Sequence, residues 1–74
     1  MIEIAPPFQD QGLGSKIIRD LQTQAQDQQK PLTLHVLKAN QSARHLYERL
    51  GFVQKAEEEN KYYMVWQPVP NNTM

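Results

Sequence analysis

The sequence contains no cysteine, which excludes disulfide bonds, thiolate zinc sites and a cysteine nucleophile together. It also has no excess charge of either sign, because eight Lys and Arg residues balance eight Asp and Glu residues. Without a basic field we expect no nucleic-acid partner. The first residues, MIEIAPPFQ, have neither the basic start of a signal peptide nor an apolar run that could cross a bilayer. We therefore expect a cytoplasmic protein that binds a small molecule or another protein, and no membrane.

The pattern of apolar residues predicts four short strands and two helices in the order β-α-β-α-β-β. In chain order they are a strand over 2–5, a helix over 12–28, a strand over 32–37, a helix over 41–50, and strands over 52–56 and 61–66. The strand over 32–37 is apolar on both sides, so we expect it inside the sheet. The first two strands are expected to be parallel, joined by a right-handed helical crossover, and the last two form an antiparallel hairpin. This predicts an α/β fold with a mixed sheet.

Several residues mark where these elements end. Pro6 and Pro7 end the first strand, because proline has no N–H to donate to a ladder. Asn40 or Ser42 is expected to cap the second helix, and Gly51 to end it in the left-handed conformation. We expect one domain over residues 1–67, followed by a flexible tail over 68–74.

The stretch FQDQGLGSKIIRDL places two glycines where the first helix begins. The first N–H groups of a helix lack partners, and glycine lets an anion approach them closely. A dinucleotide-binding fingerprint is excluded because Ile17 stands where its third glycine would be, and a P-loop is excluded because no glycine lies five residues before Gly14. A plain structural turn remains an alternative for the loop alone.

Two motifs in order resolve this alternative. Gln9-x-x-Gly12-x-Gly14 is followed, some 25 residues later, by LKANQSARHLYERLGF. Together they resemble the GNAT family of N-acetyltransferases over about residues 2–66. In that family the first motif wraps the pyrophosphate of acetyl-CoA, and an Asn, an Ala, a Tyr and a Gly-Phe pair complete the cofactor site. The resemblance implies a partial GNAT fold that corresponds to the acetyl-CoA-binding half.

The resemblance also implies roles for individual residues. The pyrophosphate of acetyl-CoA or coenzyme A would lie on the amides of residues 11–15, and the pantetheine would run along residues 3–5. The implied cofactor-binding residues are Ile4, Ala5, Gln9, Gln11, Gly12, Leu13, Gly14, Ser15, Asn40 and Ala43. Tyr47 would donate a proton to the departing thiolate as the catalytic acid. Two structural alternatives stay open, namely that Asn40 only caps the helix and that Tyr47 only packs in the core.

The other polar residues give weaker indications. His35 and His45 lie on different elements without carboxylate or cysteine neighbours at ligand spacing, so we expect no metal site and treat both as structural or surface residues. Glu3 is a candidate base for the acceptor amine. The run 57–59 is expected to be a solvated turn, with attraction of a cationic amine as the alternative. Tyr62, Met64 and Trp66 are expected in the core or an interface.

The resemblance implies transfer of an acetyl group from acetyl-CoA to a small-molecule or peptide amine. Full-length GNAT members carry about three further strands and one or two helices before the strand that MIEIA represents, and that half supplies much of the acceptor pocket. A chain without that half is expected to expose a strand edge and to form a homodimer. The alternative function is a noncatalytic acyl-CoA-binding or protein-interaction module.

Overall fold

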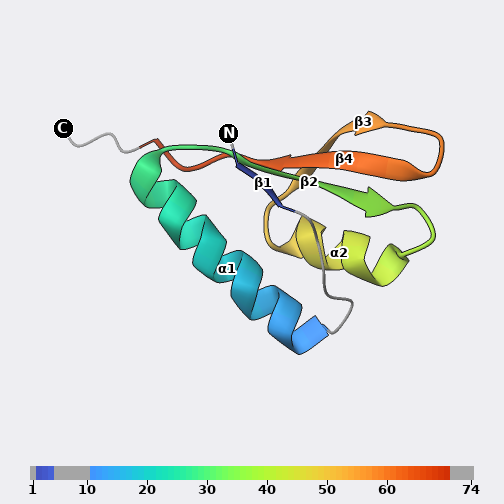
Figure 1. The fold of residues 1–74 in the computed structure, drawn as a ribbon, viewed down its shortest axis with the longest axis horizontal. Helices are drawn as coiled ribbons and strands as arrows, with labels where there is room; N and C mark the ends of the chain where they lie inside the picture. The colour runs from blue at the N-terminus through green and yellow to red at the C-terminus, as the bar shows by residue number, and fades with distance from the viewer. Residues whose placement is uncertain (1, 5–10, 71–74) are drawn as a thin grey trace.

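The fold is a four-stranded sheet with both helices on one face, as the computed structural model shows for residues 2–4 and 11–70 (Figure 1). Its elements are β1 (Ile2–Ile4), α1 (Gln11–Gln28), β2 (Leu32–Leu37), α2 (Gln41–Arg49), β3 (Val53–Glu57) and β4 (Lys61–Trp66). This order and the mixed sheet confirm the predicted fold class. Four boundaries differ by one residue: α1 begins one residue earlier than predicted, α2 ends one residue earlier, and β3 begins and ends one residue later. The predicted last residue of the first strand, Ala5, lies outside the described residues.

The strand order β1-β2-β4-β3 places β2 inside the sheet, as its two apolar sides predict. β1 and β2 are parallel, and their pairing ends where Ile4 lies opposite Leu34. β2 continues to Leu37 and stays paired with β4 on its other side over its full length. The last three residues of β2 therefore have no β1 partner within the described part of the chain.

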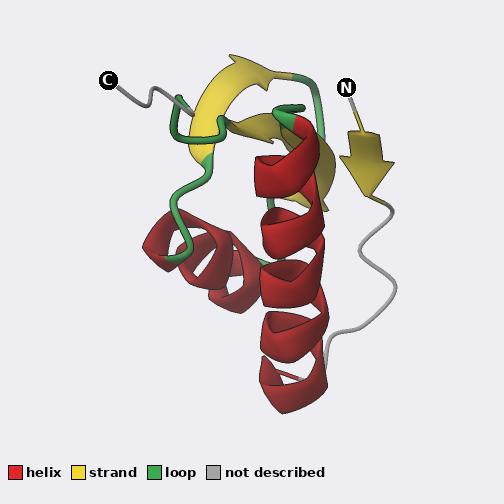
Figure 2. Ribbon diagram, turned by 90° about the vertical axis from the view of Figure 1, so that its left-hand side faces the viewer, coloured by secondary structure: helices red, strands yellow, loops and turns green. Residues whose placement is uncertain are grey.

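One core lies between the sheet and the two helices (Figure 2). Alternate residues of β2 face the helices, because successive side chains of a strand point to opposite sides of the sheet. The core residues are Ile18, Ala25, Leu32, Leu34, Val36, Tyr47, Phe52 and Met64, with Tyr62 and Trp66 packed partly buried against them. The predicted core placement of Tyr62, Met64 and Trp66 is confirmed.

The ends of α2 show both predicted signals. The Asn40 side-chain oxygen accepts the Ala43 N–H at 3.2 Å, so Asn40 rather than Ser42 is the N-cap. At the other end Gly51 has φ +99°, the left-handed region expected of it. An ideal Cβ at Gly51 would lie only 3.1 Å from Cδ1 and 3.3 Å from Nε1 of Trp66. Backbone conformation and packing therefore both favour glycine at this position.

Replacing Gly51 with alanine is expected to destabilise the fold by about 1–3 kcal/mol, the usual cost of a strained left-handed non-glycine residue. Urea unfolding followed by circular dichroism measures the change. The matched control is Gly14→Ala, which lies within α1, where alanine is expected to stabilise the helix by up to about 1 kcal/mol. Equal stability of the two variants would contradict the assigned role of Gly51.

The segment after β4 contacts α1. The Gln26 side-chain amide donates to the Val69 carbonyl at 2.7 Å and accepts the Val69 N–H at 2.8 Å. Gln29 also donates to the Val69 carbonyl, at 3.0 Å. The beginning of the segment expected as a flexible tail is thus held by side chains of α1, while residues 71–74 lie outside the described residues.

Candidate functional site

Both helices begin at the same edge of the sheet. β1 and β2 are parallel, and each is followed in the chain by a helix, so α1 and α2 both start beyond the carboxyl ends of these strands (Figure 1). The first turn of a helix presents unpaired N–H groups and the positive end of the helix dipole. Open α/β sheets bind their ligands outside the carboxyl ends of parallel strands. This edge is therefore a chemically suitable place for an anionic ligand.

The glycine motif falls at the start of α1. Residues 11–15, all named as cofactor-binding residues from the sequence, form the first turn of this helix and the beginning of the second. Ile4 is the last residue of β1. Ala5 and Gln9, the other two predicted residues of this region, lie outside the described residues. Gly12 and Gly14 add no Cβ to the helix start, so its N–H groups are less shielded from a phosphate.

Asn40 and Ala43 lie together at the start of α2. The hydrogen bond from the Ala43 N–H to the Asn40 carboxamide oxygen satisfies one of the unpaired donors of this helix. Asn40 therefore caps α2, which is one of the two roles left open for it.

Tyr47 lies on the face of α2 that packs against the sheet. It is 3% exposed, and its ring is tilted against that of Phe52 with centroids 5.9 Å apart. Burial raises the pKa of the Tyr47 hydroxyl above its ordinary value. Tyr47 is therefore a neutral phenol at physiological pH, the form that a proton donor needs. The same burial agrees with a packing role, so geometry alone leaves both interpretations of Tyr47.

The opposite face of the sheet holds a cluster that sequence reasoning missed. His35 has Nδ1 3.2 Å from a carboxylate oxygen of Glu3 and Nε2 3.3 Å from one of Glu58. Its ring lies 5.0 Å from the ring of Tyr63, its partner in β4. No carboxylate stands at ligand spacing from His35 along the sequence, but β1 and the turn after β3 bring two of them to its ring from residues far away in the chain. The available signal was strand alternation, which places His35 on the face opposite Leu34 and Val36.

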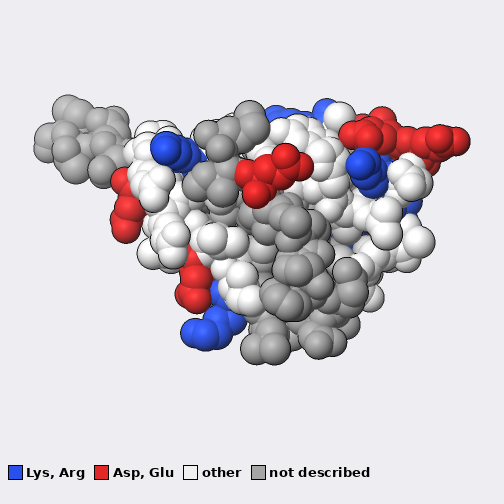
Figure 3. All heavy atoms as spheres, in the orientation of Figure 1, with Lys and Arg blue, Asp and Glu red and all other residues white. Residues whose placement is uncertain are grey.

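The end of the β3–β4 hairpin is acidic and carries one close ion pair. Acidic side chains gather over this end of the sheet, with basic groups beside them (Figure 3). Lys38 Nζ lies 2.6 Å from Glu57, and this hydrogen bond, followed by the charge of Lys38, lowers the pKa of the Glu57 carboxyl. Glu57 is therefore an anion already paired with a cation, whereas Glu58 approaches His35.

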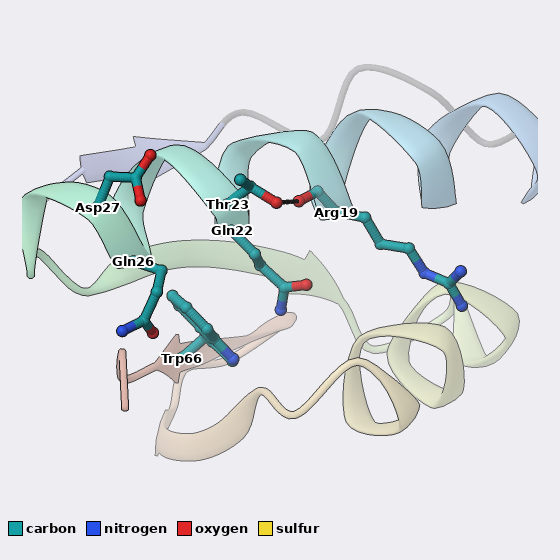
Figure 4. A pocket seen from close by; sticks show the side chains of 6 residues that line it. All are labelled: Arg19, Gln22, Thr23, Gln26, Asp27 and Trp66. Atoms are coloured by element: carbon teal, nitrogen blue, oxygen red, sulfur yellow. Dashed lines mark hydrogen bonds between the residues drawn. The ribbon is translucent and has the colours of Figure 1, made fainter. Parts of the chain in front are cut away.

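A groove of about 440 Å³ lies at a different place, between the middle and carboxyl-terminal part of α1 and the end of β4. Gln22 and Gln26 point from α1 toward the Trp66 ring (Figure 4). The complete lining is Arg19, Gln22, Thr23, Gln26, Asp27 and Trp66. None of these residues belongs to the predicted cofactor site, so this groove is separate from the edge where the helices begin.

Neither helix of the described residues combines the length and apolarity needed to cross a membrane. No group of three His, Asp or Glu side chains in residues 2–4 and 11–70 is arranged to hold a metal ion.

Comparison with known proteins adds a family assignment to this geometry. A family model described as "FR47-like protein" matches residues 1–64 of the 74-residue chain. Curated proteins give no match. The FR47-like family is related to the GNAT acetyltransferases, which confirms the resemblance seen in the two motifs. The chain therefore belongs to the FR47-like family of GNAT-related, acetyltransferase-like domains.

Proposed function

We propose that the chain binds acetyl-CoA at the edge where α1 and α2 begin and transfers its acetyl group to an amine. The observation that carries this proposal is the register of β1 and β2. Within the described residues the β1–β2 pairing runs up to Ile4 and Leu34, β2 runs on to Leu37, and both helices start beyond this point. An extended ligand arm fits beside an unpaired strand edge, because the backbone there offers hydrogen bonds to it.

The residues present suit the cofactor. The pyrophosphate carries negative charge, and the start of α1 offers N–H donors next to two glycines. The pantetheine arm is uncharged and carries amide groups, which suit the backbone donors and acceptors of a strand, and residues 3–5 are the strand segment proposed to hold it. When bound, acetyl-CoA supplies an activated acyl group as a thioester. The chain's own part is to hold the cofactor at the edge and, through the Tyr47 hydroxyl, to give a proton to the leaving sulfur.

The depth of Tyr47 favours one rival function. The 3% exposure of Tyr47 is also explained by packing alone, with no catalytic role. The rival is a noncatalytic acyl-CoA-binding or protein-interaction module of the same fold. Both hypotheses include the helix-start site, and they differ in turnover.

Isothermal titration of the purified chain with acetyl-CoA tests the proposal, with dephospho-CoA and free pantetheine as probes of each cofactor part. We expect binding of acetyl-CoA and dephospho-CoA and much weaker binding of pantetheine, which lacks the pyrophosphate. Equal affinity for all three ligands would contradict the proposed pyrophosphate site. Absence of acetyl-CoA binding would contradict the proposed function. Acetylation of an amine panel then separates the enzyme from the binding module.

The same preparation tests the proposed homodimer. β1 is the outermost strand of the sheet, and an open strand edge favours pairing with a second chain. The exposed large apolar residues of the described part, Ile17, Leu37, Val53 and Val69, lie on different segments rather than in one element. We therefore expect association through the edge of β1, and light scattering that gives a monomer at micromolar concentration would count against it.

A further inference from the structure

We propose that His35 is a positioning residue that links Glu3 to Glu58 as a proton relay for the acceptor amine, an inference that rests on the proposed function. The relay lies on the sheet face opposite the helices. It uses two residues, His35 and Glu58, to which sequence analysis gave no catalytic role.

The geometry connects three groups from three segments. Glu3 comes from β1, His35 from β2 and Glu58 from the turn after β3, with the imidazole between the carboxylates at 3.2 and 3.3 Å. A neutral imidazole has one donor and one acceptor nitrogen, so it can take a proton on one side and give one on the other. The two contacts use different ring nitrogens, which is the arrangement that such a transfer needs.

The surroundings keep the ring in this orientation. Tyr63 flanks the imidazole from β4. The Glu58 N–H donates to the Lys61 carbonyl at 2.8 Å, and the Lys38 N–H donates to the Asn60 carbonyl at 2.9 Å, so the turn that carries Glu58 is tied to both β4 and the end of β2. Lys61 Nζ also lies 3.9 Å from a carboxylate oxygen of Glu58.

The position of the cluster agrees with the proposed reaction. Among the described residues the β1–β2 pairing runs up to Ile4 opposite Leu34, and His35 is the next residue of β2. The cluster therefore stands beside the edge at which the thioester would arrive. Tyr47 approaches the sheet from the helix side, where it packs in the core with Leu34 and Val36. The base and the acid would thus lie on opposite faces of the sheet.

The proton balance is complete. An amine R–NH₃⁺ gives one proton to the Glu3 carboxylate, Glu3 passes it to Nδ1 of His35, and Nε2 releases its own proton to Glu58 and then to water. The lone pair of R–NH₂ forms the C–N bond as the C–S bond breaks. The sulfur leaves with the electron pair of the broken C–S bond. The sulfur takes a proton from Tyr47, and Tyr47 regains one from the new N–H⁺. Release of the proton to water is supported by solvent exposure, since the Glu58 side chain is 47% exposed and the His35 side chain is 30% exposed.

The test compares Glu58→Gln and His35→Gln with Glu57→Gln as a matched control. Glu57 lies next to Glu58 but pairs with Lys38. Acetylation of 1,4-diaminobutane, lysine amide and a peptide with a free N-terminus is measured from about pH 6 to 10, together with acetyl-CoA affinity. We expect Glu58→Gln and His35→Gln to lower kcat by up to about 100-fold near pH 6–7, the lower end of the range for acid–base assistance. Glu57→Gln is expected to match the parent.

The pH dependence distinguishes a relay from a structural cluster. Alkyl amines lose their proton near pH 10, where no base is needed, so a relay defect shrinks as the pH rises. A structural defect stays constant with pH or appears as lower acetyl-CoA affinity, and either result overturns the relay. Unchanged kcat values in both variants would also overturn the relay. The same holds if the parent binds acetyl-CoA but acetylates no amine of the panel. A parent without acetyl-CoA affinity contradicts the proposed function itself, and the relay falls with it.

Discussion

Replacement of Gly12 with valine is expected to weaken acetyl-CoA binding about a hundredfold, the loss that follows when close approach of a phosphate to helix-start N–H groups is blocked. Gly12 is the second residue of α1, in the turn whose donors have no partner within the helix. A branched side chain there occupies the space that the pyrophosphate needs. Isothermal titration gives the affinity, and circular dichroism shows whether the fold persists.

The control for this variant is Gln24→Val. Gln24 is an exposed residue in the middle of α1, so this change adds the same β-branched side chain to the same helix away from its start. We expect Gln24→Val to bind acetyl-CoA like the parent. A folded Gly12→Val protein with the parent's affinity would show that the start of α1 does not hold the pyrophosphate.

Replacement of Tyr47 with phenylalanine is expected to lower kcat about 10- to 1,000-fold with nearly unchanged acetyl-CoA affinity. Phenylalanine keeps the ring that packs against Phe52 and removes only the hydroxyl. A lost proton donor affects the transition state and leaves ground-state binding intact. Because burial raises the pKa of Tyr47 above its ordinary value, any alkaline loss of activity through this residue is expected at a higher pH than for an exposed tyrosine.

Tyr62→Phe serves as the comparison. Tyr62 also contacts the core, but from β4, where Lys38 and Arg44 both lie close to its ring. We expect its loss of a hydroxyl to leave kcat unchanged. Steady-state kinetics and melting curves are measured on all three proteins. If Tyr47→Phe has the parent's kcat and changes stability only, by about 1 kcal/mol for a lost hydrogen bond, Tyr47 is a packing residue.

The sequence alone determined the elements and their order, because the signals for them are local. Apolar spacing marks helices and strands, and Gly51 ends α2 through a conformation that glycine adopts most easily. The two-sided apolar pattern of β2 also placed this strand inside the sheet. The motif pair indicated the family as well, since it depends on residue types at fixed spacing, and the family comparison confirms it.

The register and the side-chain clusters were decided only by the tertiary structure. The register that sets Ile4 opposite Leu34, while β2 continues to Leu37, depends on how two separate strands align. The choice of Asn40 over Ser42 as the cap depends on the actual start of α2. The contacts of His35 with Glu3 and Glu58 join residues 32 and 23 positions apart. Such contacts arise from the folding of the sheet as a whole, and no periodicity along the chain records which distant carboxylates will meet one imidazole.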